Sequence, residues 1–364
     1  MALLIPLGLV SVLAAVWLMG WSFLRLLAVL FLVWLIVLVM FLAAPAAEVR
    51  SLGAFSLKSW LVSGIILFIV LGYAGIVRAI RARATELWGD PQEHGKHAPV
   101  AFAAVEQPAT DPEVLERYAR HIVLREIGGP GQAKLRKASV LIVGAGGLGA
   151  PAALYLAGAG VGRIGLVDPD TVSLSNLQRQ IIYRTSDAGR PKGLAAAEAL
   201  RALNPLIDVQ AMRYRVTAED LDLLADYDLV LDGTDSFEDR AAINAACVAA
   251  GVPLIAGSIS QWEGQLSSYD PASGGPCFAC IFPDAPAPGL ALPCAEAGVV
   301  GPLPGVIGSM MALEAIKQIT GAGRDMKGQM LVYDGLYGET RTIRMARRPD
   351  CPICSGLGTV APEA

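Results

Sequence analysis

Histidine is scarce in this chain. Three histidines, His94, His97 and His121, occur in 364 residues, and the first two lie in a polar stretch. They offer little material for a histidine-based catalytic centre or metal site. Cysteine is also sparse: four of the six cysteines form two C-x-x-C pairs, which fits metal binding in a reducing compartment better than a disulfide framework.

Charged residues are nearly absent from residues 1–77, which contain only Arg25, Glu48, Arg50 and Lys58. These four contribute +2 to a total of −4, so the rest of the chain carries −6. An acidic remainder argues against a general nucleic-acid-binding surface. We therefore expect no nucleic-acid partner, but small or specific ligands.

The N-terminal region has the composition of membrane segments. The first apolar run, residues 1–47, is about twice the roughly 20 residues that cross a bilayer once, and a second run covers 60–77. We predict three transmembrane α-helices within residues 1–84, with two as the alternative. A cleaved signal peptide fits less well, because no basic segment precedes the run. Arg78, Arg81 and Arg83 then place the following part of this multi-pass membrane protein in the cytoplasm.

A polar, proline-containing stretch follows, and we interpret residues 85–112 as a linker. Asp111 and Pro112 have the residue types of an N-cap and a first helical position, which predicts a short helix through Ile122. We assign residues 113–356 to one folded domain and 357–364 to a C-terminal tail.

The folded domain is organised around SVLIVGAGGLG at residues 139–149. The apolar run fits a buried strand, and Gly144, Gly146 and Gly149, with Gly147 between them, match G-x-G-x-x-G at the start of a helix. Such a turn lets the backbone approach a phosphate at the positive end of the helix dipole. The pattern predicts a nucleotide site, although glycine turns also occur for packing alone.

Polar residues downstream fit the same nucleotide site. Asp168 ends the next strand-like run, where an acidic side chain commonly accepts hydrogen bonds from a ribose. Asn176 and Arg179 follow within reach of the phosphates, unless their loop is simply solvated. Lys192 opens a helix, where a cation is electrostatically misplaced unless it serves an anion.

The run LDGTDSFEDR places Asp232 and Asp235 at the carboxyl end of another strand, where ligands of such sheets bind. Asp235 could hold Mg²⁺ beside the phosphates, cap the following helix, or do both.

Strand-like and helix-like runs alternate from residue 139 to 258, which predicts a Rossmann-like, doubly wound and mostly parallel α/β sheet. A long helix from about Pro304 to Thr320 follows. The later runs GQLSSYD, QMLVYDG and ETRTIRMA read as added antiparallel strands.

The two C-x-x-C pairs, Cys277 with Cys280 and Cys351 with Cys354, can supply four thiolates to one tetrahedral zinc ion. A redox pair is the alternative. Cys247 lies in an apolar helical run and suits the core.

Several motifs together resemble the ThiF/MoeB family, the bacterial relatives of ubiquitin-activating enzymes. They are RYARH, GAGGLG, LVDPDTVSLSNLQRQ, DGTDSFEDR, NAACVAAGVPLI, CFAC, CAEAGVVGP and CPIC, in the family's order between about Leu115 and Gly356. The resemblance implies an enzyme that uses ATP and Mg²⁺ to adenylate the C-terminal Gly-Gly carboxylate of a small ubiquitin-like sulfur-carrier protein, releasing pyrophosphate. It also implies a homodimer with a structural zinc.

The resemblance also implies residue roles. Nucleotide binding falls to Gly146, Asp168, Asn176, Arg179 and Lys192. Asp235 becomes the magnesium-associated catalytic aspartate, Arg120 reaches the partner subunit's ATP site, and Cys294 stands where some members link covalently to the carrier. Cations must stabilise the attack of a carboxylate on the α-phosphate, whereas no general base is needed because a terminal carboxylate is already ionised.

The chain departs from the family pattern in three places. Ser236 stands where Asn is frequent, His121 stands where Gln is frequent, and the apolar N-terminal region is additional. The molybdopterin and thiazole branches are not separated by the motifs. An NAD- or FAD-dependent oxidoreductase would explain the glycine loop alone, and a noncatalytic scaffold would not explain why Arg120, Lys192 and Asp235 are present.

Overall fold

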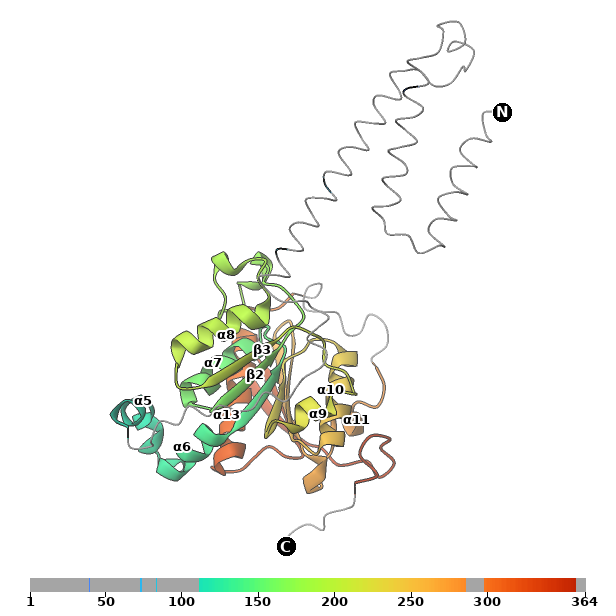
Figure 1. The fold of residues 1–364 in the computed structure, drawn as a ribbon. Coiled ribbons are helices and arrows are strands. Elements are labelled where there is room, and N and C mark those ends of the chain that lie inside the picture. Colours follow the sequence, from blue (N-terminus) through green and yellow to red (C-terminus); the bar gives the residue numbers. More distant parts are fainter. Residues whose placement is uncertain (1–38, 40–72, 74–82, 84–110, 286–297, 358–364) are drawn as a thin grey trace, which may run out of the picture. The chain divides into compact units, whose positions relative to one another are not determined.

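A computed structural model describes residues 39, 73, 83, 111–285 and 298–357 (Figure 1). The chain divides into two compact units, Met1–Asp90 and Pro91–Ala364, and the elements below belong to the second. Within the described ranges, no helix is both long and apolar enough to cross a membrane. The predicted spans, apart from isolated positions, and the predicted linker up to residue 110 lie outside the described residues.

The described residues form one eight-stranded sheet in the order β3-β2-β1-β4-β5-β6-β7-β8. The first five strands in this order are parallel to one another, and β6, β7 and β8 are added antiparallel. The strands are β1 (Ser139–Val143), β2 (Arg163–Val167), β3 (Asp208–Met212), β4 (Leu229–Asp232), β5 (Leu254–Ser260), β6 (Glu263–Tyr269), β7 (Gln329–Asp334) and β8 (Glu339–Arg344). This confirms the predicted mixed, mostly parallel sheet.

Continuous apolar runs explain why the central strands are parallel and covered on both faces. In β1, Val140 to Val143 are all buried, and β2 and β4 are buried along their whole length. The register pairs Val143 with Val167 on one side and with Asp232 on the other. The carboxyl ends of β1, β2 and β4 therefore meet at one edge of the sheet.

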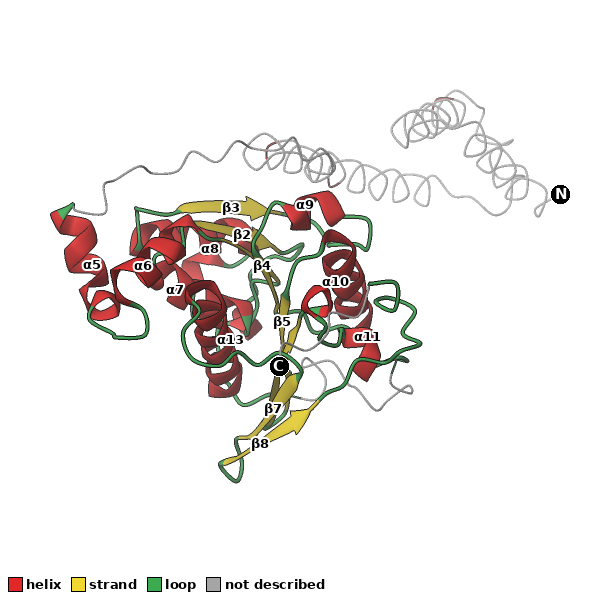
Figure 2. Cartoon of the chain, turned by 90° about the horizontal axis from the view of Figure 1, so that it is seen from below, coloured by secondary structure: helices red, strands yellow, loops and turns green. Residues whose placement is uncertain are grey.

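Helices cover both faces of the sheet (Figures 1 and 2). Their bounds are α5 (Pro112–Ile122), α6 (Gly128–Lys137), α7 (Gly149–Ala159), α8 (Lys192–Leu203), α9 (Leu221–Ala225), α10 (Phe237–Ala250), α11 (Phe278–Ile281) and α13 (Pro302–Thr320), with short 3₁₀ turns at Leu174–Asn176, Thr185–Asp187 and Pro271–Ser273. Side chains of α6, α7, α8 and α13 share one buried cluster with the sheet, and those of α9, α10 and α11 share another. The two layers identify the doubly wound arrangement.

The predicted helix at Asp111 is present as α5, and the Asp111 carboxylate accepts a hydrogen bond from the Glu113 amide at 2.9 Å. No sequence pattern predicted α6, which begins GGPGQ. Its first turn lacks a side-chain cap, so contacts with α5 and α13 rather than local propensity hold it.

Candidate active site

A cavity of about 340 Å³ opens at the carboxyl ends of β1, β2 and β4. The chain reverses its winding between β1 and β4, and sheets of this kind bind ligands at that point. Most of the residues singled out in the sequence line the cavity, namely Gly144, Gly146, Gly147, Asp168, Asn176, Arg179, Lys192 and Asp235. Residues far apart in the sequence thus share one site.

The glycines of the loop after β1 serve different purposes. Gly144 has φ +90°, and a Cβ at Gly149 would stand 1.8 Å from the Gly144 carbonyl oxygen, so both are required by the turn itself. Gly149 is absent from the cavity lining, and the close approach of the Gly144 carbonyl accounts for a glycine there. A Cβ at Gly147 would meet Pro304 at 3.0 Å, whereas one at Gly146 would meet nothing closer than Gln180 at 3.6 Å. Open space therefore lies over Gly146, as a phosphate cradle requires.

The peptide of Ala145 inside this loop is held from both sides. Its N–H donates to Asp168 Oδ2 at 2.8 Å, and its carbonyl accepts a hydrogen bond from the Tyr183 hydroxyl at 2.7 Å. Tyr183 is buried and was not identified from the sequence. The two side chains fix the loop in the conformation that faces the cavity.

Asp168 is buried at the end of β2 and also accepts the Asp170 amide, at 2.8 Å from Oδ1. Burial raises the pKa of Asp168, and the positive charge of Lys192 and the two backbone donors lower it only in part. Lys192 is itself buried at the first position of α8, with Nζ 2.9 Å from Asp170 Oδ2. A negative and a positive group, Asp168 and Lys192, thus both line the cavity beside the glycine loop.

Asn176 and Arg179 lie on the loop that follows Asp170. Asn176 Oδ1 accepts the Ser173 amide at 3.1 Å and thereby closes a 3₁₀ turn, so the residue shapes the loop in addition to facing the cavity. Arg179 lines the cavity and donates to the Ser175 carbonyl at 3.3 Å, a contact long enough for an anion to displace.

Asp235 lies on the cavity rim, just beyond β4. Its alternative role as N-cap of the following helix is wrong, because Ser236 caps α10 by accepting the Asp239 amide at 3.0 Å. Asp235 is thus exposed on the cavity rim, before the helix begins. The preceding turn is held by Asp232, whose Oδ1 accepts the amide and the hydroxyl of Thr234 at 2.8 Å and 2.6 Å.

Arg240 is a cavity residue that the sequence reading missed. Its guanidinium donates to the Thr234 and Gly257 carbonyls, tying the turn after β4 to β5. Arg240 sits in the first turn of α10, where a cation is unfavourable. Like Lys192, Arg240 is a cation near the start of a helix, and this is the signal that marks it in the sequence.

Arg120 and Cys294 are the remaining candidate catalytic residues. Arg120 is exposed in the last turn of α5 and is not part of the cavity lining. Cys294 lies outside the described residues.

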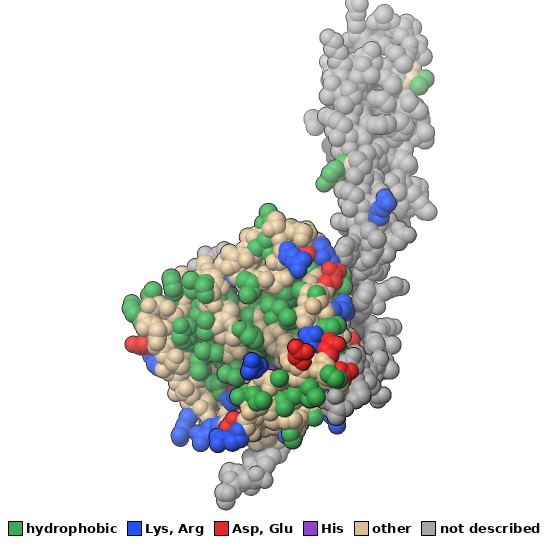
Figure 3. Space-filling model, turned by 90° about the vertical axis from the view of Figure 1, so that its left-hand side faces the viewer, with side chains coloured by type: hydrophobic (Ala, Val, Ile, Leu, Met, Phe, Trp, Pro, Cys, Tyr) green, Lys and Arg blue, Asp and Glu red, His purple; other side chains and the backbone are tan. Residues whose placement is uncertain are grey.

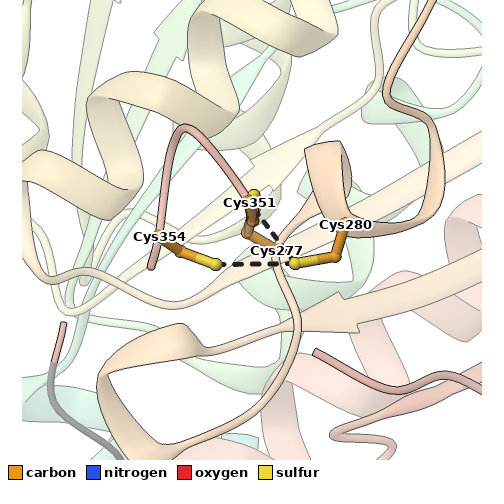
Figure 4. Close-up of side chains that lie close together, drawn as sticks. All are labelled: Cys277, Cys280, Cys351 and Cys354. Atoms are coloured by element: carbon orange, nitrogen blue, oxygen red, sulfur yellow. Dashed lines mark hydrogen bonds between the residues drawn. The ribbon is translucent and has the colours of Figure 1, made fainter. Parts of the chain in front are cut away.

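The two C-x-x-C pairs come together at one place, as Figure 4 shows. Cys277 Sγ lies 3.8 Å from Cys280 Sγ and 3.6 Å from Cys351 Sγ, and Cys280 Sγ lies 3.5 Å from Cys354 Sγ. Four sulfurs at about 2.3 Å from one zinc ion stand roughly 3.8 Å apart, so the spacing fits a tetrahedral site. All four residues are buried, and the Arg348 amide donates to Cys280 Sγ at 3.4 Å.

Contacts with neighbouring elements position the two cysteine pairs. Asn244 of α10 accepts the Phe278 amide at 2.8 Å and fixes the first pair, and the chain after β8 brings the second pair back to it. Cys247 is buried in α10, outside the cluster, as predicted for a core residue.

Comparison with known proteins agrees with this geometry. The ThiF family matches residues 118–353. The chain is 47% identical over 247 residues, 66% of its length, to the sulfur carrier protein adenylyltransferase of Thermus thermophilus, of which it covers 91%. It is 42% identical to the SAMP-activating enzyme E1 of Haloferax volcanii over 68% of this chain and 92% of that protein.

Longer relatives and solved structures match as well. The chain is 45% identical to the mouse adenylyltransferase and sulfurtransferase MOCS3 over 77% of its own length, but it spans only 61% of that protein. The crystal structure of Escherichia coli MccB with ATP has a TM-score of 0.58 and 23% identity, covering 66% of this chain and 75% of that one, and it supports the fold alone. With 47% identity to a relative covered almost end to end and a family match over most of its folded domain, this chain belongs to the ThiF family.

Proposed function

We propose that the protein is an ATP-dependent adenylyltransferase that activates the C-terminal Gly-Gly carboxylate of a small ubiquitin-like sulfur-carrier protein and releases pyrophosphate. The observation that carries the proposal is the single cavity where the glycine loop, Asp168, Arg179, Lys192 and Asp235 meet. The name of the Thermus thermophilus relative supports the same reaction. The carrier belongs to the molybdopterin-synthase or the thiazole type.

The cavity supplies what each part of ATP needs. Asp168 is placed to accept a ribose hydroxyl, because each of its oxygens has a second lone pair beyond the backbone hydrogen bonds. The open backbone at Gly146 admits a phosphate, and Arg179 and Lys192 provide positive charge beside it. These cations counter the repulsion between the attacking carboxylate and the α-phosphate.

Asp235 is our proposed ligand for Mg²⁺. The ion takes oxygen ligands and usually only one or two protein carboxylates, and Asp235 presents an exposed carboxylate on the cavity rim. Mg²⁺ would neutralise phosphate charge when bound. Asp232 and Arg240 hold the turn that carries Asp235.

We also propose a homodimer in which Arg120 acts on the partner subunit's ATP. Exposed apolar side chains occur on helices that pack together, Tyr155 on α7 and Leu313 on α13, and Figure 3 shows hydrophobic side chains gathered on one face. A mixture of Arg120→Ala and Asp235→Ala proteins should recover activity that neither has alone. Mixed dimers without recovery would exclude an arginine supplied in trans.

The four cysteines are proposed to hold a structural zinc ion, since a closed four-sulfur site leaves no position for a reactant. For Cys294 we propose a covalent link to the carrier. A thiol-sensitive adduct detected by intact mass analysis, absent in Cys294→Ala, would support it, and its absence from the wild type would reject it.

We propose a membrane region at residues 1–84, a linker at 85–112, an adenylation domain at 113–356 and a C-terminal tail at 357–364. The support for the membrane region is the apolar composition of residues 1–77. The protein should stay with membranes after alkaline extraction, with the catalytic domain accessible from the cytoplasmic side. Release into the extract would contradict multi-pass insertion.

An oxidoreductase and a scaffold are the competing functions. The decisive test adds ATP and a Gly-Gly-ended carrier to the full-length protein and measures pyrophosphate. Carrier-dependent release supports the adenylyltransferase. Reduction of a nicotinamide or flavin without pyrophosphate would favour the oxidoreductase, and neither signal would favour a noncatalytic role.

A further inference from the structure

Gln180 is a buried carboxamide on the wall of the nucleotide cavity. The residue is 4% exposed, and its Oε1 has no hydrogen-bond partner within the described ranges. A buried amide oxygen without a partner destabilises the fold, whereas a methionine would fill a similar volume without that cost. Packing alone therefore gives no reason for a carboxamide at this position.

The other end of the carboxamide lies next to the glycine loop. Nε2 is 3.6 Å from the position that a Cβ at Gly146 would occupy, and no other described atom beyond the adjacent residues comes within 4 Å of that position. Gly146 is not among the glycines with a positive φ, so backbone conformation does not explain why this residue lacks a side chain. The space between Gly146 and Nε2 is thus open to a ligand.

The neighbouring residues indicate which part of ATP occupies this space. The peptide of Ala145, one residue before Gly146, is bonded to Asp168, the proposed ribose acceptor. The α-phosphate is the phosphate nearest the ribose, so it falls over Gly146. Arg179, adjacent in sequence to Gln180, also lines the cavity and supplies charge there.

We propose that Gln180 Nε2 donates a hydrogen bond to an α-phosphate oxygen of bound ATP, an inference that rests on the proposed function. The α-phosphate is the group under attack, and a donor fixed beside its oxygens stabilises the charge that they gain. A neutral donor stabilises the phosphate oxygens without adding a second positive charge that could bind the incoming carboxylate. Arg179 and Lys192 already provide the cationic part of the site.

The test measures binding of ATP, AMP and adenosine to the full-length protein with Mg²⁺, for the wild type, Gln180→Met and Gln180→Glu. Losing one hydrogen bond to a charged acceptor should weaken ATP and AMP binding by about 10-fold in Gln180→Met and leave adenosine unchanged. Gln180→Glu should weaken ATP and AMP further, because a carboxylate repels phosphate.

Other outcomes overturn the inference. Weaker adenosine binding would move the contact to the nucleoside, a loss for ATP without AMP would move it to the outer phosphates, and no loss would leave Gln180 a packing residue. Thermal unfolding without nucleotide should show Gln180→Met at least as stable as the wild type. If that variant does not fold, Gln180→Glu decides.

The same experiment separates this inference from the proposed function. Wild-type ATP binding with no carrier-dependent pyrophosphate release would reject the adenylyltransferase proposal while the Gln180 comparison still stands. Unchanged ATP binding by both variants, beside normal pyrophosphate release by the wild type, would reject the Gln180 contact alone.

Discussion

The ammonium group of Lys192 lies 2.9 Å from the carboxylate of Asp170 at the mouth of the nucleotide cavity. The two side chains differ sharply in environment, since Lys192 is 8% exposed and Asp170 is 64% exposed. A largely solvated carboxylate is a weak partner, so the pair adds little to stability. We expect the phosphates of bound ATP to replace Asp170 as the partner of Lys192.

Two variants separate the members of this pair. Lys192→Met should lower carrier adenylation by about 100-fold or more, because it removes charge that stabilises the transition state. Asp170→Asn should tighten ATP binding, since the competing carboxylate charge is gone. Rates of pyrophosphate release and ATP dissociation constants check both. An equal loss of activity and of ATP affinity in the two variants would show that the pair only stabilises the local structure.

Asp168 should make ATP binding pH-dependent. Burial raises its pKa, Lys192 and two backbone donors offset part of the rise, and the charge of Asp170 adds to it. ATP affinity should fall as the pH drops through this raised pKa, because a protonated Asp168 no longer accepts the Ala145 amide as a carboxylate does. Asp170→Asn should move the midpoint to lower pH. An unmoved midpoint would exclude Asp168 as the titrating group.

The effect of Asp168 on stability has the opposite sign. Its folded-state pKa lies above the unfolded value, so its stabilising contribution is fully present below the unfolded pKa and is lost as the pH rises through the folded pKa. As the pH rises across that window, ionisation of Asp168 lowers the free energy of unfolding, whereas we expect it to raise the affinity for ATP. A buried carboxylate retained at such a cost fits a ligand-binding role.

The sequence predicted the central fold because the strands of this sheet are buried on both faces. Val140 to Val143 form an unbroken apolar run, which is typical of a parallel strand covered on both faces. The helix α6 escaped prediction, since GGPGQ contains residues that end helices elsewhere and only contacts with α5 and α13 stabilise it. Tertiary contacts of this kind leave no local pattern.

Site residues could be predicted where a residue type is unusual for its place in a helix or strand. Lys192 stood out as a cation at a helix start. The cap of α10 was predicted as an alternative role of Asp235, whereas the structure gives it to Ser236, and residue type does not separate the two because Asp and Ser both cap helices. The partners Tyr183 and Gln180 could not be found in this way. Their roles depend on which loops the fold brings beside Ala145 and Gly146.

Arg240 and Asp232 should be energetically coupled. Burial raises the pKa of Asp232, and the nearby charge of Arg240 partly offsets that rise. Arg240→Met should therefore destabilise the protein by about 2 kcal/mol, since it removes a positive charge near a buried carboxylate and leaves the Thr234 and Gly257 carbonyls without their donor. Denaturant unfolding of Arg240→Met, Asp232→Asn and the double variant should give a coupling energy of about 1–3 kcal/mol. Strictly additive losses would contradict the coupling.

The cysteine cluster should hold one zinc ion per chain. Cys277→Ser should lose the metal and lower the thermal unfolding temperature, because a structural site contributes directly to folding. Cys247→Ser is the matched control, a buried cysteine outside the cluster that should keep its zinc. Metal content by mass spectrometry checks both variants. Full zinc in Cys277→Ser would show that the two pairs do not share an ion.

Isotope exchange between pyrophosphate and ATP tests the central claim most directly, because it requires reversible formation of a carrier adenylate. We predict exchange that depends on a carrier ending in Gly-Gly, that disappears when its last glycine is removed, and that falls by about 100-fold or more in Asp235→Asn. Exchange that proceeds equally without the carrier's terminal glycine, or that survives intact in Asp235→Asn, would contradict the account.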